Sequence, residues 1–292
     1  MAKYRGRSGL LVFNPNKPVR FGYKFFMLID RSSNFIVNFF ISSPSAPGAQ
    51  KSSVTDHVLS LLSVLVDLGQ RAFSVIFDNW FATWPLIRKL YGMRVRVTAT
   101  MRTNRAQLNK TMPPTIKALD SQESIFWMRP DHTTLLAWRP LPSSQDRVKK
   151  PILFATTECP PRATALLNHW DPAQKKTVQV KGPEVVRHYR EGMGGSDLAN
   201  RMMQTHEASL KHHRKWFPGF KRVLSIITFN AFVLYSRVSE GKLDCGLPLR
   251  NQKVFLCQLV EQLVDPALHE RTKPPRPPHA PPPVASTSGS ES

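Results

Sequence analysis

The sequence predicts a mixed α/β fold, in which a sheet core is covered by helices. Short apolar runs rich in aromatic and β-branched residues alternate with longer stretches whose apolar residues recur at helical spacing. They follow one another in the order strand, strand, helix, strand, helix, strand, which indicates a mixed sheet. With 292 residues and 41% hydrophobic content, the chain can build one sizeable core and a second small subdomain.

The first predicted elements are a hairpin and a helix. Two apolar runs, at 21–29 and 35–41, are separated by a polar stretch, so we expect them to form the two strands of a hairpin. Prolines and a glycine at 42–53 predict a loop. At 54–68 the apolar residues recur near helical spacing, which predicts an amphipathic helix packed on the sheet.

A buried strand and a capped helix come next. The short apolar run 73–77 is typical of a strand buried on both faces. Residues 84–91 fit a helix that Thr83 caps and Gly92 ends. Residues 95–100 are predicted to be a further strand.

The rest of the chain changes character several times. Many prolines and short strand-like runs follow the first strands, and helical periodicity returns at 196–210 and 216–238. The final residues, rich in proline and serine, cannot bury a core, so we expect disorder there. We therefore expect, in chain order, the first part of a core, a β-rich insertion, the last core helices, a helical extension and a tail, at 1–104, 105–190, 191–240, 241–270 and 271–292.

The charge predicts a polyanionic partner. The chain has 41 lysines and arginines against 20 acidic residues, a formal net charge of +21. The basic residues are spread along the sequence, which favours a folded electropositive face over a disordered basic arm. Nucleic acid is the commonest partner of such a surface, although a merely solvated basic surface is the alternative.

The cysteines and the apolar runs exclude several classes of protein. Cys159, Cys245 and Cys257 lie far apart and form no CxxC pair, so we expect no disulfide framework and no zinc site. No run approaches 18 apolar residues, and no leader sequence is evident at the N-terminus. We therefore expect neither a membrane span nor secretion.

Two carboxylates stand at the ends of predicted elements. Asp78 follows the strand at 73–77, and because Thr83 is better placed to cap the next helix, Asp78 has no evident local role. Asp197 follows two glycines at the start of a helix, where Ser196 as N-cap and an acidic first turn would be ordinary capping. Two such carboxylates in a basic α/β protein also fit the ligands of hard divalent cations.

Several ordered stretches resemble the transposase domain of the piggyBac superfamily. The most specific are FDNWFATWPL at 77–86, VTATMRTNR at 97–105 and GGSDLA at 194–199. Shorter similarities to the family's Lys-Pro-x-x-x-Gly segment and to its helical end occur at 14–18, 21–24, 214–216 and 230–235. The resemblance covers about residues 5–240.

The resemblance implies an RNase H-like core, N-terminally truncated here, and a triad of aspartates that bind two Mg²⁺ ions. By motif, Asp78 matches the second aspartate and Asp197 the third. The first would belong to an Asp-Glu motif just upstream of 5–7, which this sequence does not contain. Asp30 falls in the hairpin turn and is no substitute, and Asn200 stands where the family often has a further acidic residue. The family's Cys-rich zinc module is also missing.

The function predicted from these features is that of a transposase-derived DNA-binding protein of the nucleus, which has lost cleavage. DNA is the expected partner and a second copy of the chain a candidate one, with no membrane. Two alternatives stay open: an active metal-dependent transposase or nuclease, if an upstream aspartate completes the triad, or a scaffold that uses its Pro-rich tail. We expect phosphate contacts from Arg102, Arg105, Lys211, Arg214 and Lys215.

Overall fold

The computed structural model describes residues 1–4, 6–15, 19–42, 53–70, 72–103, 113–129, 131–141, 150–171, 174–205, 214–238 and 251–271. Its contacts divide the chain into two compact units, Met1–Leu234 and Tyr235–Ser292. The candidate site residues all belong to the first unit. Of the predicted phosphate-binding residues, Arg105 and Lys211 lie outside the described part of the chain, as do Cys245 and the Pro-rich tail.

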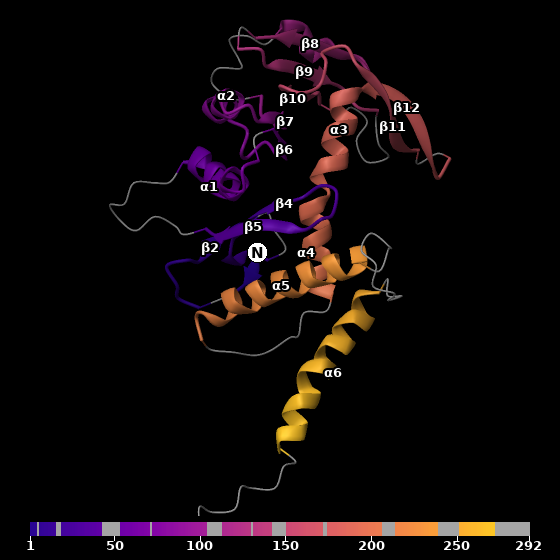
Figure 1. Ribbon diagram of the computed structural model, residues 1–292. Coiled ribbons are helices and arrows are strands. Elements are labelled where there is room, and N and C mark those ends of the chain that lie inside the picture. Colours follow the sequence, from indigo (N-terminus) through magenta and orange to yellow (C-terminus); the bar gives the residue numbers. More distant parts are fainter. Residues whose placement is uncertain are drawn as a thin grey trace, which may run out of the picture. The chain divides into compact units, whose positions relative to one another are not determined.

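The largest sheet in the described part of the first unit is mixed and five-stranded (Figure 1). Its order is β6-β7-β10-β9-β8, with β6 parallel to β7 and all other neighbours antiparallel. The strands are β6 (Ser74–Phe77), β7 (Arg96–Met101), β8 (Ser124–Met128), β9 (Thr134–Trp138) and β10 (Ile152–Thr156). Three of these strands come from the predicted insertion, so the sheet continues across the boundary expected at residue 104.

Two predicted helices contribute to the core of this sheet. The helix α1 (Val54–Asp67) begins with a capping box, in which Ser53 and Asp56 satisfy each other's backbone N–H groups. The helix α2 (Trp84–Gly92) follows β6. Their buried residues join those of β6, β7, β9 and β10 in one core, which contains Leu62, Leu86, Ile87, Leu90, Val97, Leu135 and Leu153. Because β7, β9 and β10 are almost continuously buried, they carry apolar residues without alternation.

A hairpin and two helices form a second core. The strands β4 (Phe25–Ile29) and β5 (Ile36–Ile41) are antiparallel and form a sheet of their own. They pack against α4 (Gly195–Thr205) and α5 (Phe217–Arg237) through Ile36, Met203, Ile226, Phe229 and Val233. The predicted hairpin is therefore confirmed, except that its first run is divided: 21–23 forms β3 (Phe21–Tyr23), which pairs with β1 (Ala2–Lys3) and β2 (Val12–Phe13).

The helix α3 (Glu184–Met193) was not predicted from the sequence. It follows an antiparallel ribbon made of β11 (Thr164–Asp171) and β12 (Lys176–Pro183). The residues Val185 and Val186 pack with Leu167 in a third core. The signal that could have identified the helix is Pro183 at the N-cap position, followed by Glu184 in the first turn.

Among the described helices, only α5 is long and apolar enough to cross a membrane. One side of it packs in the second core through Ile226, Phe229 and Val233. Core helices of soluble proteins have the same length and composition, so this is weak evidence for a span. The described part of the second unit is dominated by α6 (Gln252–Arg271), which ends one residue beyond the helical extension predicted at 241–270. In this unit the rings of Tyr235 and Phe255 lie 5.2 Å apart.

Candidate functional site

Asp78 lies directly after β6 and is half-buried. Its Oδ1 accepts a hydrogen bond from the Trp80 backbone N–H at 2.9 Å. Its carbonyl oxygen accepts from the N–H groups of Phe81 and Ala82 at 3.2 and 3.3 Å. The expectation that Asp78 has no local role is therefore wrong, because its side chain and backbone both stabilise the turn that leads into α2.

Thr83 does not have the capping role predicted for it. It occupies the N-cap position of α2, but its hydroxyl makes no capping hydrogen bond and is buried without a described partner. Pro85 in the first turn has no N–H, which reduces the number of donors that need a cap. The helix also ends one residue later than predicted, with Met93 at the C-cap position.

A lysine and a tyrosine from distant segments lie near the Asp78 carboxylate. The Lys24 ammonium lies 3.9 Å from the centre of the Trp80 ring and 4.5 Å from that of Phe26. Burial lowers the pKa of Lys24, and the negative charge of Asp78 partly offsets this effect. Burial also raises the pKa of Tyr189, whose hydroxyl lies 3.1 Å from that of Thr100, and the Asp78 charge adds to the rise. Neither Lys24 nor Tyr189 was predicted from the sequence to belong to this site.

Asp197 is exposed in the first turn of α4. No glycine loop separates α3 from α4, because α3 runs to Met193 and Gly194 keeps a right-handed helical conformation. The carbonyl of Gly194 already accepts the N–H of Leu198. The predicted capping by Ser196 is therefore wrong: Ser196 lies inside the helix rather than at its N-cap.

The junction between α3 and α4 lies against both β6 and β4. A side chain at Gly192 would come within 2.2 Å of Ile76 Cδ1 in β6. One at Gly195 would meet Ile29 at 3.4 Å and Asn34 at 3.5 Å, at the end of the β4–β5 hairpin. The glycines therefore allow a close approach that brings the segment carrying Asp197 toward the strand that precedes Asp78. Within the described residues, no hydrogen bond or ion pair joins the two carboxylates.

The donor set around Asp78 does not fit a divalent metal. The described part of the chain contains no group of three or more His, Cys, Asp or Glu residues that could hold an ion. One oxygen of Asp78 is engaged by the Trp80 amide, and the Lys24 cation lies nearby. A cation already close to a carboxylate opposes the approach of a second one. We therefore derive no metal-dependent step for these residues.

Two further residues considered for the acidic site have structural partners. Asp30 accepts hydrogen bonds from the hydroxyls of Ser32 and Ser33 and from the Ser33 N–H, which closes the hairpin turn. Burial alone would raise the pKa of Asp30, but these hydrogen bonds outweigh it and lower the pKa. The Asn200 side-chain oxygen accepts a hydrogen bond from the guanidinium of Arg222, which is only 4% exposed.

Arg102 contacts Asn79, the residue that follows Asp78, and forms part of a hollow. Its Nε donates to the side-chain oxygen of Asn79 at 2.9 Å. The hollow has a volume of about 570 Å³ and is lined by Asn79, Thr100, Met101, Arg102, Thr103, Lys150, Pro151, Ile152 and Leu153. Lys150 was not singled out from the sequence, because its position beside Arg102 depends on the antiparallel pairing of β7 with β10.

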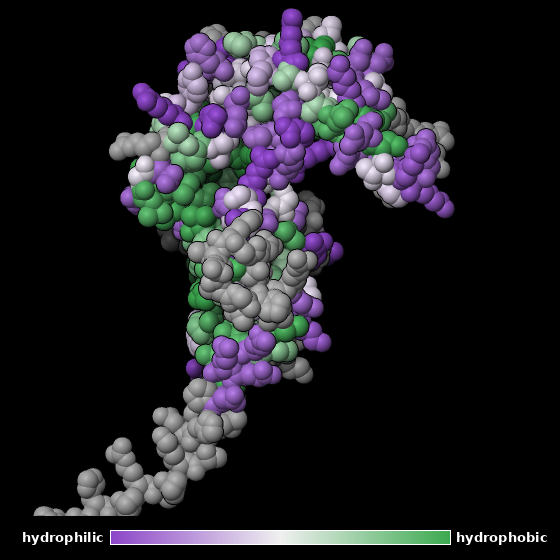
Figure 2. Space-filling view, turned by 45° about the vertical axis from the view of Figure 1, so that its right-hand side comes forward, coloured by the Kyte–Doolittle hydropathy of each residue, from purple (hydrophilic) through white to green (hydrophobic). Residues whose placement is uncertain are grey.

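Arg214 and Lys215 are exposed just before α5, whereas Arg102 follows β7 and is far from them in sequence. The hydroxyl of Tyr23 donates to the Lys215 carbonyl at 2.6 Å, which ties this segment to β3 and leaves the lysine side chain exposed. Figure 2 shows hydrophilic residues over much of the face in view, with hydrophobic ones between them.

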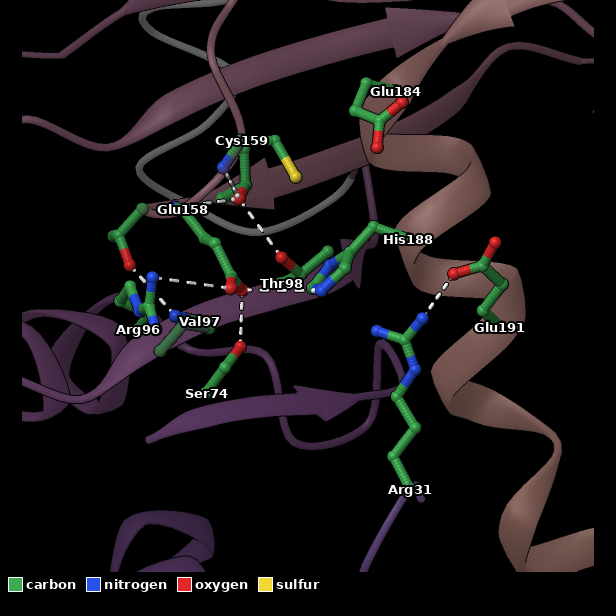
Figure 3. Close-up of polar contacts among 12 residues, drawn as sticks. Arg31, Ser74, Arg96, Val97, Thr98, Glu158, Cys159, Glu184, His188 and Glu191 are labelled. Carbon is green, nitrogen blue, oxygen red and sulfur yellow. Dashed lines mark hydrogen bonds and ion pairs between the residues drawn. The ribbon is translucent and has the colours of Figure 1, made fainter. Parts of the chain in front are cut away.

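A polar cluster at the other end of the sheet attaches α3 to the strands (Figure 3). Glu158 accepts a hydrogen bond from Ser74 and lies 3.8 Å from Arg96 and 3.6 Å from His188. The same helix is held by an ion pair between Arg31 and Glu191. Because Ser74 and Arg96 begin β6 and β7, whereas Asp78 follows the end of β6, this cluster is separate from the candidate site.

Cys159 does not form a nucleophilic pair in this cluster. Burial raises the pKa of its thiol, which disfavours the reactive thiolate. The nearby His188 Nε2 faces Glu158 instead. Figure 3 shows the cysteine sulfur beside Thr98 and the imidazole directed toward Glu158. The described residues therefore give no support to cysteine catalysis.

The fold and the ordered motifs define a member of a transposase family. Residues 1–232 match the sequence model of the DDE-type family Transposase IS4, and the chain belongs to that family. Within it the chain is of the piggyBac-derived type. It is 25% identical over 255 residues to human piggyBac transposable element-derived protein 3, and equally to the human chimeric ERCC6-PGBD3 protein.

These relatives are longer than the chain. The matches cover 84% of this chain but 40% and 22% of the two human proteins. The fold is similar to that of the piggyBac transposase in a cryo-EM structure of its synaptic complex with hairpin DNA, with a TM-score of 0.73 and 21% identity. That similarity covers 98% of this chain and 57% of the transposase chain.

Proposed function

We propose that this piggyBac-derived protein binds DNA through its basic surface and does not cleave it. The family membership and the net charge of +21 support binding to a polyanion. The solved relative was determined in a complex with hairpin DNA, which makes DNA the natural polyanion. The proposal includes nuclear localisation, because a DNA-binding protein of this kind must reach the DNA in the nucleus. The proposal also includes a homodimer, in which two copies of the chain bind the DNA together.

The observation that carries the proposal is the position of Arg102. Its guanidinium is oriented by Asn79, adjacent to the site aspartate Asp78, and Lys150 lines the same hollow. A guanidinium held by one neighbour keeps its other N–H groups in a fixed fork, which suits a phosphate. Arg214 and Lys215 supply a second exposed basic position. These are the contacts expected for binding that tolerates many DNA sequences.

Loss of cleavage is proposed because the described residues contain no complete acidic set. In-line phosphoryl transfer by two metal ions needs carboxylates that hold both ions. Asp78 and Asp197 are the two candidate ligands. Asp30 instead closes a turn, and Asn200 accepts a hydrogen bond from Arg222. The RNase H-like character of the core is part of the same proposal, supported by the order hairpin, helix, strand, helix, strand from β4 to β7.

The first test removes Arg102. For Arg102→Ala we expect a uniform loss of affinity for duplexes of different sequence, because a phosphate contact carries no sequence information. The slope of log affinity against log salt should decrease by about 1. Fluorescence anisotropy with two unrelated duplexes, over a series of salt concentrations, measures both quantities.

The matched control is Arg88→Ala, which removes the same charge from the exposed surface of α2. Its salt slope should equal that of the parent protein. If both variants behave alike, the hollow that Arg102 lines has no special part in DNA binding. A change of affinity for only one of the two duplexes would contradict a phosphate contact by Arg102.

A further inference from the structure

The β11–β12 ribbon has two faces of opposite character. Its eight residue pairs run from Thr164↔Pro183 to Asp171↔Lys176 without a shift in register. One face packs on α3: Leu167 is buried with Val185 and Val186. Gly182 pairs with Ala165 and lies diagonally across from Leu167, where a Cβ would come within 2.3 Å of Leu167 Cδ1. This packing fixes which side of the ribbon faces solvent.

The solvent face carries large apolar side chains among amides and lysines. Trp170 is 58% and Leu166 61% exposed. Asn168 pairs with Gln179 between them, Leu166 pairs with Lys181, and Trp170 pairs with Thr177. All six of these residues are exposed. A ribbon with one solvated face ordinarily places polar residues there, so the exposed tryptophan and leucine need another explanation.

The charge on the ribbon is positive. Lys175 is exposed in the turn that follows Trp170, and Lys181 is exposed at the other end of the same face, whereas Lys176 pairs with Asp171 and points to the opposite face. The one acidic residue of the two strands, Asp171, neighbours Trp170 and therefore points to the opposite face. Positive charges on both sides of an exposed aromatic ring match a strand of nucleic acid, in which phosphates flank each base.

We propose that the exposed ribbon face binds single-stranded nucleic acid. The indole of Trp170 stacks on an unpaired base, the amides of Asn168 and Gln179 reach base edges, and the lysines bind phosphates on either side. A ring needs the face of a base, and in a duplex the faces are covered by stacking, which favours a single strand over paired DNA. This inference rests on the proposed DNA binding and adds a second, base-contacting surface to it.

The test compares two probes, a 20-nucleotide thymidine strand and a duplex of the same length, at one low salt concentration. Trp170→Ala should weaken binding of the single strand about fivefold to a hundredfold, the range for one stacked base. Its affinity for the duplex should stay unchanged. Trp170→Phe should restore much of the single-strand affinity, because a phenyl ring also stacks. In Lys175→Ala/Lys181→Ala, measured over a series of salt concentrations, the salt slope for the single strand should decrease by about 1.4.

The control variant is Tyr91→Ala, which removes another exposed aromatic residue, from the end of α2. Single-strand binding by this variant should equal that of the parent, and thermal unfolding confirms that each variant is folded. If the parent binds both probes and Trp170→Ala binds the single strand equally well, the stacking site is wrong while DNA binding stands. Equal losses on both probes also overturn it. If the parent binds neither probe, the proposed function itself fails.

Discussion

The affinity of this protein for duplex DNA is expected to fall by at least about a thousandfold between roughly 50 and 200 mM salt. Binding to DNA releases the cations condensed on each neutralised phosphate, and this release becomes less favourable as salt increases. A net charge of +21 and exposed basic residues such as Arg102, Arg214 and Lys215 provide for several such contacts. Equilibrium binding of one labelled duplex over this range measures the slope.

Thermal unfolding at each salt concentration serves as the control, since the fold must persist where binding is lost. Affinity that stays flat over this range would show that the basic surface makes few phosphate contacts. Absence of binding at the lowest salt would contradict the nucleic-acid function altogether.

Ile226→Ala is expected to lower the free energy of unfolding by about 2–5 kcal/mol. Ile226 is 1% exposed in the core that joins α5 and α4 to the β4–β5 hairpin, where it neighbours Ile36 and Phe229. Truncation removes apolar contacts and leaves a cavity among side chains from several elements. Denaturant unfolding of the purified protein measures the loss.

The adjacent Ile227 provides the matched control. It has the same side chain on the same helix but is 56% exposed, so Ile227→Ala should change stability by no more than about 0.5 kcal/mol. Equal effects of the two substitutions would mean that α5 does not pack on the hairpin through this face. The comparison therefore tests the second core independently of any DNA binding.

Local patterns were sufficient to predict the elements whose burial is regular along the sequence. The hairpin, α1, β6, α2 and α5 all follow from apolar periodicity and turn residues. The pattern failed for α3, because its short amphipathic stretch lies directly after a long β-ribbon and has few buried residues. The joining of β8, β9 and β10 to β6 and β7 could not be predicted either, since strand order depends on long-range pairing.

The candidate site was predicted only in part for the same reason. Motif similarity identified Asp78, Asp197 and Arg102, but it contained no information on what surrounds them. Lys24, between β3 and β4, and Tyr189, in α3, lie near enough to Asp78 to feel its charge, although both are remote from it in sequence. The hydrogen bond from the Trp80 N–H to the Asp78 carboxylate is local. The sequence could not predict it, because the same residues fit a turn without this bond equally well. The division into a core, an insertion and a helical extension stays a prediction.

The central claim is that this protein binds DNA and leaves it intact, and one incubation tests it directly. Labelled hairpin DNA with a piggyBac-like end is mixed with the protein at low salt, with magnesium or manganese, and both retention and strand length are measured. The account predicts DNA that is retained and uncut, with no change for Asp78→Ala beyond its effect on folding. Metal-dependent nicks that disappear in Asp78→Ala would contradict it, and would mean that another residue completes the acidic site.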